Sequence, residues 1–151
     1  MRSGKHINFL DMKYTLSILV FTLSSFALSA QKEAVDNTPY KVVFQLTSGD
    51  TLAHKALIKQ LNNLLTAAPK AQLEVVCHNM GIYFLVTEKT QQAAGIRDLK
   101  ARGVDFVGCE NTLRERKINR TELMPEVCTV PAGILEIVKK QRKKWAYIKA
   151  G

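Results

Sequence analysis

The sequence has few of the patterns that identify a protein's chemistry directly. Among its 151 residues there is no glycine-rich phosphate-binding motif and no Ser-His-Asp order typical of hydrolases. Its 3 cysteines and 3 histidines lack the spacing of a closed metal site. No internal repeat or low-complexity segment is visible. We therefore expect one domain without a metal or a cofactor, whose chemistry depends on its own side chains.

Positive charge is in excess, yet no pattern points to nucleic acid. The formal net charge is +9. Many of the basic residues form two clusters, one of Arg114, Arg116, Lys117 and Arg120 and one of Lys139, Lys140, Arg142, Lys143 and Lys144. No aromatic residue interleaves the first cluster, and no nucleic-acid-binding motif occurs. We expect no nucleic-acid partner, and interpret the clusters as a solvated helical face or as attraction to an acidic partner.

The N-terminal residues have the pattern of a secretory signal peptide. Lys13 precedes an apolar run over residues 15–28, and small residues follow. We predict that residues 1–30 are a signal peptide cut after Ala30. Cleavage after Ala27 or Ser29 is the alternative. An uncleaved membrane anchor is less favoured, because the apolar run is short for a membrane span and contains several Ser and Thr.

The predicted signal peptide sets the bounds of the segments that follow it and the expected location of the protein. Met12 is an alternative start, because residues 1–11 are unusual in front of such a signal. Residues 31–39 are polar without periodicity and are expected to form a flexible tail. The domain would then occupy residues 40–151. We expect it in the periplasm or outside the cell, with no stable membrane span after the leader is removed.

Strand-like and helix-like segments alternate from residue 40 onward. The predicted strands are residues 40–46, 73–77, 104–108, 126–130 and 145–148, the last at an edge. The predicted helices are residues 51–67, 88–102 and 110–117, and a last helix with Pro131 as its first residue and with Ile134, Leu135, Ile137 and Val138 as its apolar face. Residues 82–86 are expected as a helical turn or loop on the sheet. This order predicts an α/β fold, a three-layer α/β/α sandwich with a mostly parallel five-stranded sheet.

Cys109 is the strongest candidate for chemistry. It follows a predicted buried strand, and polar residues able to cap a helix come directly after it. Backbone N–H groups and the helix dipole at such a point favour an anion, and a thiolate is an anion. The alternative is a buried cysteine that acts as a small apolar residue at a strand end.

Other candidates lie in the loops that follow the strands, where the crevice of a parallel sheet is expected. His78 is expected as a base or as a donor to bound sulfur or an anion, with a structural loop histidine as the alternative. The predicted ligand-binding residues are Gly49, Asp50, Asn79, Glu110, Asn111 and Thr112. For Asp50, Glu110 and Asn111, helix capping is an equally sufficient explanation. His54 is expected to be a partly exposed helix residue.

The two other cysteines of the domain have less distinctive positions. Cys77 and Cys128 fall within predicted strands, where buried packing is the favoured interpretation. A Cys77–Cys109 disulfide stays conceivable if the two Cα atoms lie within roughly 7 Å. A metal site made by Cys77, His78 and Cys109 is disfavoured by its spacing.

Four segments together resemble the DsrE/DsrF-like family. They are Val-Val-Phe-Gln-Leu at 42–46, Glu-Val-Val-Cys-His at 74–78, Gly-Val-Asp-Phe-Val-Gly-Cys-Glu-Asn-Thr-Leu at 103–113 and Val-Pro-Ala-Gly-Ile-Leu-Glu-Ile-Val at 130–138. The resemblance covers about residues 40–149 and implies an α/β sandwich that forms homo- or hetero-oligomers. In the sulfur-relay members of this family, a cysteine at the position of Cys109 carries a persulfide. The secretory leader departs from the cytoplasmic relay proteins.

Two hypotheses follow from these observations. In the first, the protein is an exported sulfur carrier of sulfurtransferase type, in which Cys109 accepts sulfane sulfur and passes it to a thiol-bearing protein partner. In the second, it is a non-enzymatic oligomeric module that binds a small anionic ligand or a protein partner, and Cys109 is structural. In both, we expect a homo-oligomer, with residues 82–86 as a candidate interface patch.

Overall fold

Strands and helices alternate along the part of the chain that the computed structural model describes, residues 35–151. The predicted signal peptide and the first residues of the tail lie outside this range. The strands are β1 (Lys41–Leu46), β2 (Gln72–Cys77), β3 (Asp105–Cys109), β4 (Cys128–Val130) and β5 (Ala146–Ala150). The helices are α2 (Thr51–Ala67), α3 (Ala93–Ala101), α4 (Glu110–Glu115) and α5 (Gly133–Arg142), with two 3-10 helices, η1 (Asn79–Phe84) and η2 (Arg120–Glu122). None of the helices within residues 35–151 is both long and apolar enough to cross a membrane.

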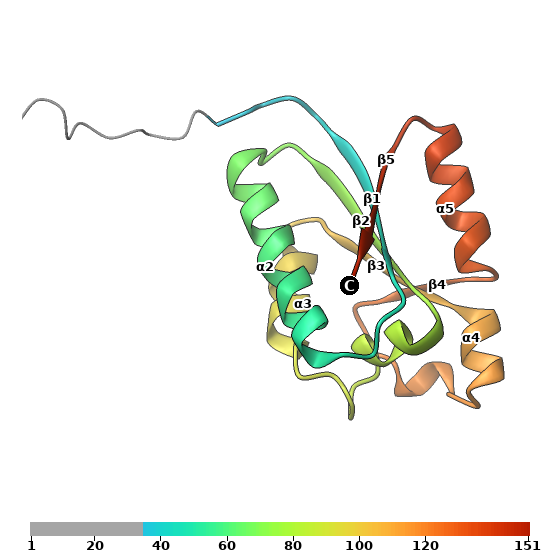
Figure 1. The fold of residues 1–151 in the computed structure, drawn as a ribbon. Helices are drawn as coiled ribbons and strands as arrows, with labels where there is room; N and C mark the ends of the chain where they lie inside the picture. Colours follow the sequence, from blue (N-terminus) through green and yellow to red (C-terminus); the bar gives the residue numbers. More distant parts are fainter. Residues whose placement is uncertain (1–34) are drawn as a thin grey trace, which may run out of the picture. The chain divides into compact units, whose positions relative to one another are not determined.

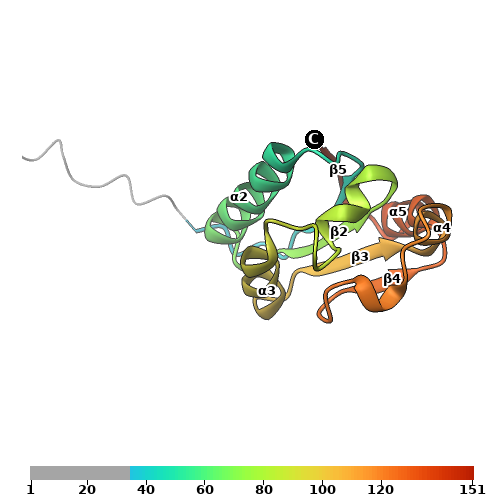
Figure 2. The same ribbon diagram turned by 90° about the horizontal axis from the view of Figure 1, so that it is seen from below.

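The five strands form one parallel sheet in the order β4-β3-β2-β1-β5. Helices α2 and α3 cover one face, and α5 covers the other with α4 on the same side (Figures 1 and 2). The predicted three-layer α/β/α sandwich is therefore confirmed. The last strand is an edge strand, as expected, beside β1.

The register of the sheet decides which residues share a face at its carboxyl edge. Leu46 is paired with Cys77, and Cys77 is paired with Gly108. Successive side chains of a strand point to opposite faces. Cys77 therefore faces the α2 side, whereas His78 and Cys109, each one residue further along the chain, face the α5 side at adjacent strand ends.

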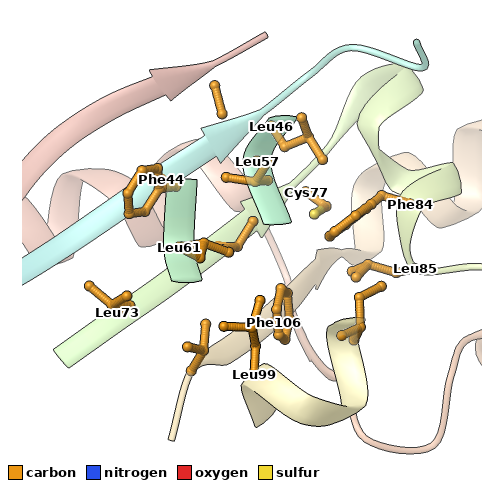
Figure 3. Packing of buried hydrophobic residues seen from close by; sticks show 14 of the residues in the cluster. Phe44, Leu46, Leu57, Leu61, Leu73, Cys77, Phe84, Leu85, Leu99 and Phe106 are labelled. Carbon is orange, nitrogen blue, oxygen red and sulfur yellow. The ribbon is translucent and has the colours of Figure 1, made fainter. Parts of the chain in front are cut away.

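The main core lies between the sheet and helices α2 and α3. Figure 3 shows Leu57 and Leu61 of α2 against strand residues such as Phe44, with Cys77 among them. Phe84 of η1 completes this core and contacts Phe106 at a ring-centroid distance of 6.0 Å. The 3-10 helix η1 therefore contributes side chains to the core rather than to the surface. Ile82, Phe84, Leu85 and Val86 are at most 2 % exposed, so residues 82–86 do not form the expected interface patch.

The opposite face of the sheet has a smaller core. It is formed by Val43, Val76 and Ile137, with Trp145 packed against them. Sequence periodicity predicted a broad buried face for α5, but only Ile137 among its large apolar side chains is buried. Ile134, Leu135 and Val138 are 56 %, 51 % and 45 % exposed.

A buried ion pair supplements this small core. The Lys140 ammonium of α5 donates to the carboxylate of Glu74, which is 4 % exposed on β2, and lies 4.3 Å from the Trp145 ring centroid. Burial raises the pKa of Glu74, and the nearby Lys140 opposes that shift. The pair holds the last turn of α5 over β2, which helps to fix the position of the whole helix.

Helix boundaries follow the capping residues in two cases. Asp50 accepts a hydrogen bond from the Leu52 N–H at 2.9 Å and begins α2, as predicted. Gly103 ends α3 with φ of +90°, a conformation that favours glycine. The N–H groups of Gly103 and Val104 bond to the carbonyls of Lys100 and Leu99, the pattern of a Schellman cap.

Several other boundaries differ from the expectation; α4 ends at Glu115 rather than residue 117, and β5 continues to Ala150 rather than residue 148. Helix α3 begins at Ala93 rather than residue 88, because the Lys89 and Thr90 N–H groups bond to the Val86 carbonyl in a turn. Helix α5 begins at Gly133, two residues after Pro131, because Ala132 has the extended conformation of an N-cap. Strand β4 is confined to Cys128–Val130, where it pairs with β3.

Candidate functional site

Cys109 occupies the junction that the sequence predicted. It is the last residue of β3 and the N-cap of α4, with extended backbone angles. The residue is 5 % exposed. Its side chain lies on the α5 face, where the start of a second helix approaches it.

The first residue of α5 donates a hydrogen bond to the cysteine sulfur. The Gly133 N–H lies 3.2 Å from Cys109 Sγ. A Cβ at position 133 would lie 3.2 Å from both Cys109 Cβ and Val76 Cγ1, tighter than ordinary packing. The absence of a side chain therefore allows the helix start to approach the sulfur this closely.

Hydrogen bonds around the sulfur favour its thiolate form. Burial alone raises the pKa of Cys109, but N–H groups of Gly133, Thr112 and Asn111 and the Thr112 hydroxyl lower it. The net effect is a pKa below the ordinary cysteine value. Backbone N–H groups at helix starts stabilise a thiolate without bringing a titratable partner into the site.

The other two cysteines of the domain have different environments. Cys77 is fully buried in the apolar core, and burial raises the pKa of its thiol. Its packing role is as predicted. Cys77 and Cys109 point to opposite faces of the sheet. Their sulfur atoms are therefore not placed to form the disulfide that the sequence left open, or to bind one metal ion together with His78. Cys128 was expected to be buried, but it is exposed as the first residue of the short edge strand β4.

Thr112 connects the sulfur to the loop after β2. Its side chain is buried, and its Oγ1 accepts a hydrogen bond from the Asn79 N–H at 3.2 Å. Asn79 has a φ of +51°, and its Oδ1 accepts from Arg116 at 2.8 Å. Three of the predicted ligand-binding residues, Asn79, Thr112 and, through its N–H, Asn111, therefore support the thiol environment, and Arg116 of the first basic cluster lies beside them.

The side chain of Asn111 and the remaining predicted ligand-binding residues have local structural roles. Glu110 accepts a hydrogen bond from the Thr129 hydroxyl at 2.8 Å, and Asn111 accepts one from Arg114. Asp50 caps α2. Gly49 packs against Met80, whose Cβ would lie 3.1 Å from a Cβ at position 49.

His78 belongs to a polar chain that crosses three strands. Its Nε2 lies 2.7 Å from Nε2 of Gln45 on β1, and the Gln45 Oε1 accepts a hydrogen bond from the Tyr147 hydroxyl of β5. Burial lowers the pKa of His78. Neither Gln45 nor Tyr147 was among the residues predicted from the sequence, although a glutamine between the apolar residues Phe44 and Leu46 was a usable indication.

His54 has a structural environment on the other face. It was expected to be partly exposed, but it is 3 % exposed, with Nε2 at 2.8 Å from the Ser48 carbonyl oxygen. Its ring lies edge-on to Phe84 with centroids 5.0 Å apart. The position of α2 over η1 accounts for this burial.

Comparisons with known proteins agree with the fold and with the family resemblance. A solved protein of unknown function from Methanobacterium thermoautotrophicum is similar, with 32% sequence identity and a TM-score of 0.70. The match covers 73% of this chain and 98% of that one. Curated proteins gave no match. The model of the DsrE/DsrF-like family matches residues 40–150, which include every strand and helix described above. The chain therefore belongs to the DsrE/DsrF-like family, a family related to sulfur relay.

Proposed function

We propose that the protein is a sulfur carrier in which Cys109 accepts sulfane sulfur as a persulfide and passes it to a thiol of a protein partner. The observation that carries the proposal is the Gly133 N–H at 3.2 Å from Cys109 Sγ, at the start of α5. This N–H can donate a hydrogen bond to a negatively charged sulfur, and so supports a thiolate or persulfide anion at Cys109. Membership of a sulfur-relay-related family supports the choice of sulfur as the cargo.

The transfer is balanced without an external oxidant. The Cys109 thiolate attacks the outer sulfur of a donor persulfide, R–S–SH. A bond forms between Sγ and that outer sulfur, the S–S bond of the donor breaks, and R–S⁻ leaves with the electron pair. An acceptor thiolate then attacks the outer sulfur of the Cys109 persulfide, and the Cys109 thiolate is the leaving group. N–H donors that stabilise this thiolate make it a better leaving group.

Burial of Cys109 favours attack at the outer sulfur over attack at Sγ. Only 5 % of the residue is exposed, so Sγ itself is poorly accessible to a protein thiol. A persulfide extends the side chain by one S–S bond of about 2 Å. The outer sulfur is then the more accessible atom, and its transfer avoids a mixed disulfide between carrier and acceptor.

The direct test is mass spectrometry of the protein after exposure to a small-molecule persulfide. We expect a gain of one sulfur atom, located on the peptide that contains Cys109, and its loss on addition of a thiol acceptor. The Cys109→Ser variant is the control. Sulfur found on Cys128 alone would contradict the proposal.

We also propose that the carrier is exported, which rests on the sequence of residues 1–30 alone. N-terminal sequencing of the cellular protein should begin near Gln31. An intact Met12 on soluble cytoplasmic protein would refute export but would leave the thiol chemistry in place.

A further inference from the structure

The polar chain of Tyr147, Gln45 and His78 has a defined direction. A glutamine amide donates only from Nε2 and accepts only at Oε1. The Tyr147 hydroxyl donates to Oε1, so Nε2 of Gln45 is the end that faces His78. Since that amide nitrogen can only donate, Nε2 of His78 has to be the acceptor.

The accepting role fixes where His78 carries its proton. A neutral imidazole has one N–H donor and one acceptor nitrogen. If Nε2 accepts from Gln45, the proton lies on Nδ1. The half-buried position lowers the pKa of His78 and so favours this neutral form.

The register of the sheet places this histidine at the end of the strand next to the one that carries the thiol. Cys77 is paired with Gly108, so the next residues, His78 and Cys109, follow at adjacent strand ends on the same face. The chain of hydrogen bonds uses Nε2 and leaves the Nδ1–H as the donor of the ring. A sulfur anion formed during transfer at Cys109 is a suitable acceptor for such a donor.

We propose that Gln45 and Tyr147 are positioning residues that hold His78 as the Nδ1–H tautomer, so that its N–H can stabilise the sulfur anion formed during transfer at Cys109. The part of this proposal that concerns transfer rests on the proposed sulfur-carrier function. The tautomer itself does not depend on it. In the transfer step, the Nδ1–H donates a hydrogen bond to the departing R–S⁻ and the proton stays on the ring.

His54 supplies an internal comparison. Its Nε2 lies 2.8 Å from the Ser48 carbonyl oxygen, which can only accept. His54 therefore carries a proton on Nε2. The two histidines of the domain are therefore expected to carry their protons on opposite ring nitrogens. Solvent conditions would act on both rings alike, so such a difference has to come from the hydrogen-bond partner of each ring.

The test is long-range ¹H–¹⁵N NMR of the imidazole nitrogens in the full chain, with signals assigned through His78→Gln and His54→Gln. We expect a protonated Nδ1 for His78 and a protonated Nε2 for His54. In Gln45→Glu the carboxylate can only accept, so His78 should gain a proton on Nε2. Tyr147→Phe keeps the aromatic ring but removes the hydroxyl that orients the Gln45 amide. His78 should then be a mixture of its two neutral tautomers. A protonated Nε2 of His78 in the wild type, or no change in Gln45→Glu, would overturn the assignment.

The role in transfer is measured separately. Gln45→Leu should slow sulfur transfer from a small-molecule persulfide by about tenfold, the size of effect expected when one hydrogen bond to a charged group is lost. Alkylation of Cys109 should be unchanged, and Gln72→Leu, an exposed glutamine on β2, should transfer at the wild-type rate. An unchanged rate in Gln45→Leu would overturn the positioning role. If the wild type takes up no sulfur at all, the carrier function fails, while the NMR result still decides the tautomer.

Discussion

The N–H of Gly133 lies 3.2 Å from the sulfur of Cys109, although 24 residues separate them in the chain. The contact joins the end of β3 to the start of the helix that follows β4. It depends on three features described above, namely the parallel β3–β4 pairing, the missing side chain at position 133 and the ion pair that anchors α5. The reactive properties of the thiol therefore depend on the packing of α5 as much as on the strand that carries the cysteine.

Adding a methyl group at Gly133 should weaken the thiolate. In Gly133→Ala the new Cβ would lie 3.2 Å from Cys109 Cβ, so the helix start has to move away. A lost hydrogen bond is worth about 1 kcal/mol, so we expect alkylation of Cys109 at neutral pH to slow by about fivefold. Leu135→Ala, on the exposed side of the same helix, should leave the rate unchanged. Equal rates for the two variants would exclude a role for the Gly133 N–H.

Removing the Thr112 hydroxyl should affect both stability and reactivity. Its oxygen accepts from the Asn79 N–H, and the hydroxyl also lowers the Cys109 pKa. Thr112→Val should lower the free energy of unfolding by about 1–3 kcal/mol in a urea titration, because a polar partner is left unsatisfied. Cys109 should also be alkylated more slowly at neutral pH. Thr112→Ser retains the hydroxyl and should resemble the wild type in both measurements.

The Glu74–Lys140 pair should give a pH-dependent defect when it is broken. Lys140→Met leaves the carboxylate of Glu74 buried without its partner, which typically costs about 3–5 kcal/mol of unfolding free energy. Because burial raises the pKa of Glu74, the folded protein holds this proton more tightly than the unfolded chain does. The stability of the variant should therefore fall as the pH rises from the ordinary value of 4.5 through the raised pKa.

A double variant separates the charge from the packing of the pair. Glu74→Gln combined with Lys140→Met should recover much of the loss at neutral pH, since no buried charge remains. Urea unfolding at acidic and neutral pH measures both effects. A Lys140→Met defect of the same size at every pH would contradict this explanation.

We predict a homo-oligomer, with α5 rather than residues 82–86 as its interface. Ile134 and Val138 lie one helical turn apart on α5 and are about half exposed. Light scattering at micromolar concentration should give a mass above that of one chain. Replacing both residues with lysine should give the monomer mass with an unchanged circular dichroism spectrum. A monomer mass for the wild type would refute the prediction.

Much of the fold followed from local sequence patterns, because the strands are short apolar runs between recognisable caps. Asp50 and Gly103 determined helix ends without help from distant residues. The burial of α5 could not be inferred in this way. Its apolar residues have helical spacing, but the sheet beneath it presents a narrow apolar surface with Glu74 in it, so a single large side chain suffices to fill the contact.

The candidate site was likewise predictable only where consecutive residues determine it. The position of Cys109 between a strand and a helix start is visible in consecutive residues, so the sequence predicted it. The Gly133 donor and the Gln45–Tyr147 chain require strand order and register, which join residues 24 and 102 positions apart. The exposure of Cys128 likewise depends on β4 being a three-residue edge strand, a tertiary property.

The most direct test of the central claim, that Cys109 is held as a reactive thiolate, is its alkylation rate against pH. Peptide mass spectrometry distinguishes it from buried Cys77 and exposed Cys128. We predict that the Cys109 rate rises with a midpoint below the free-cysteine value of about 8.5, because the N–H donors around the sulfur lower its pKa. We also predict that, at acidic pH, Cys109 is labelled faster than Cys128 despite its burial. A midpoint near 8.5, or labelling of Cys109 no faster than Cys77, would contradict the account and favour a non-enzymatic binding module in which Cys109 is structural.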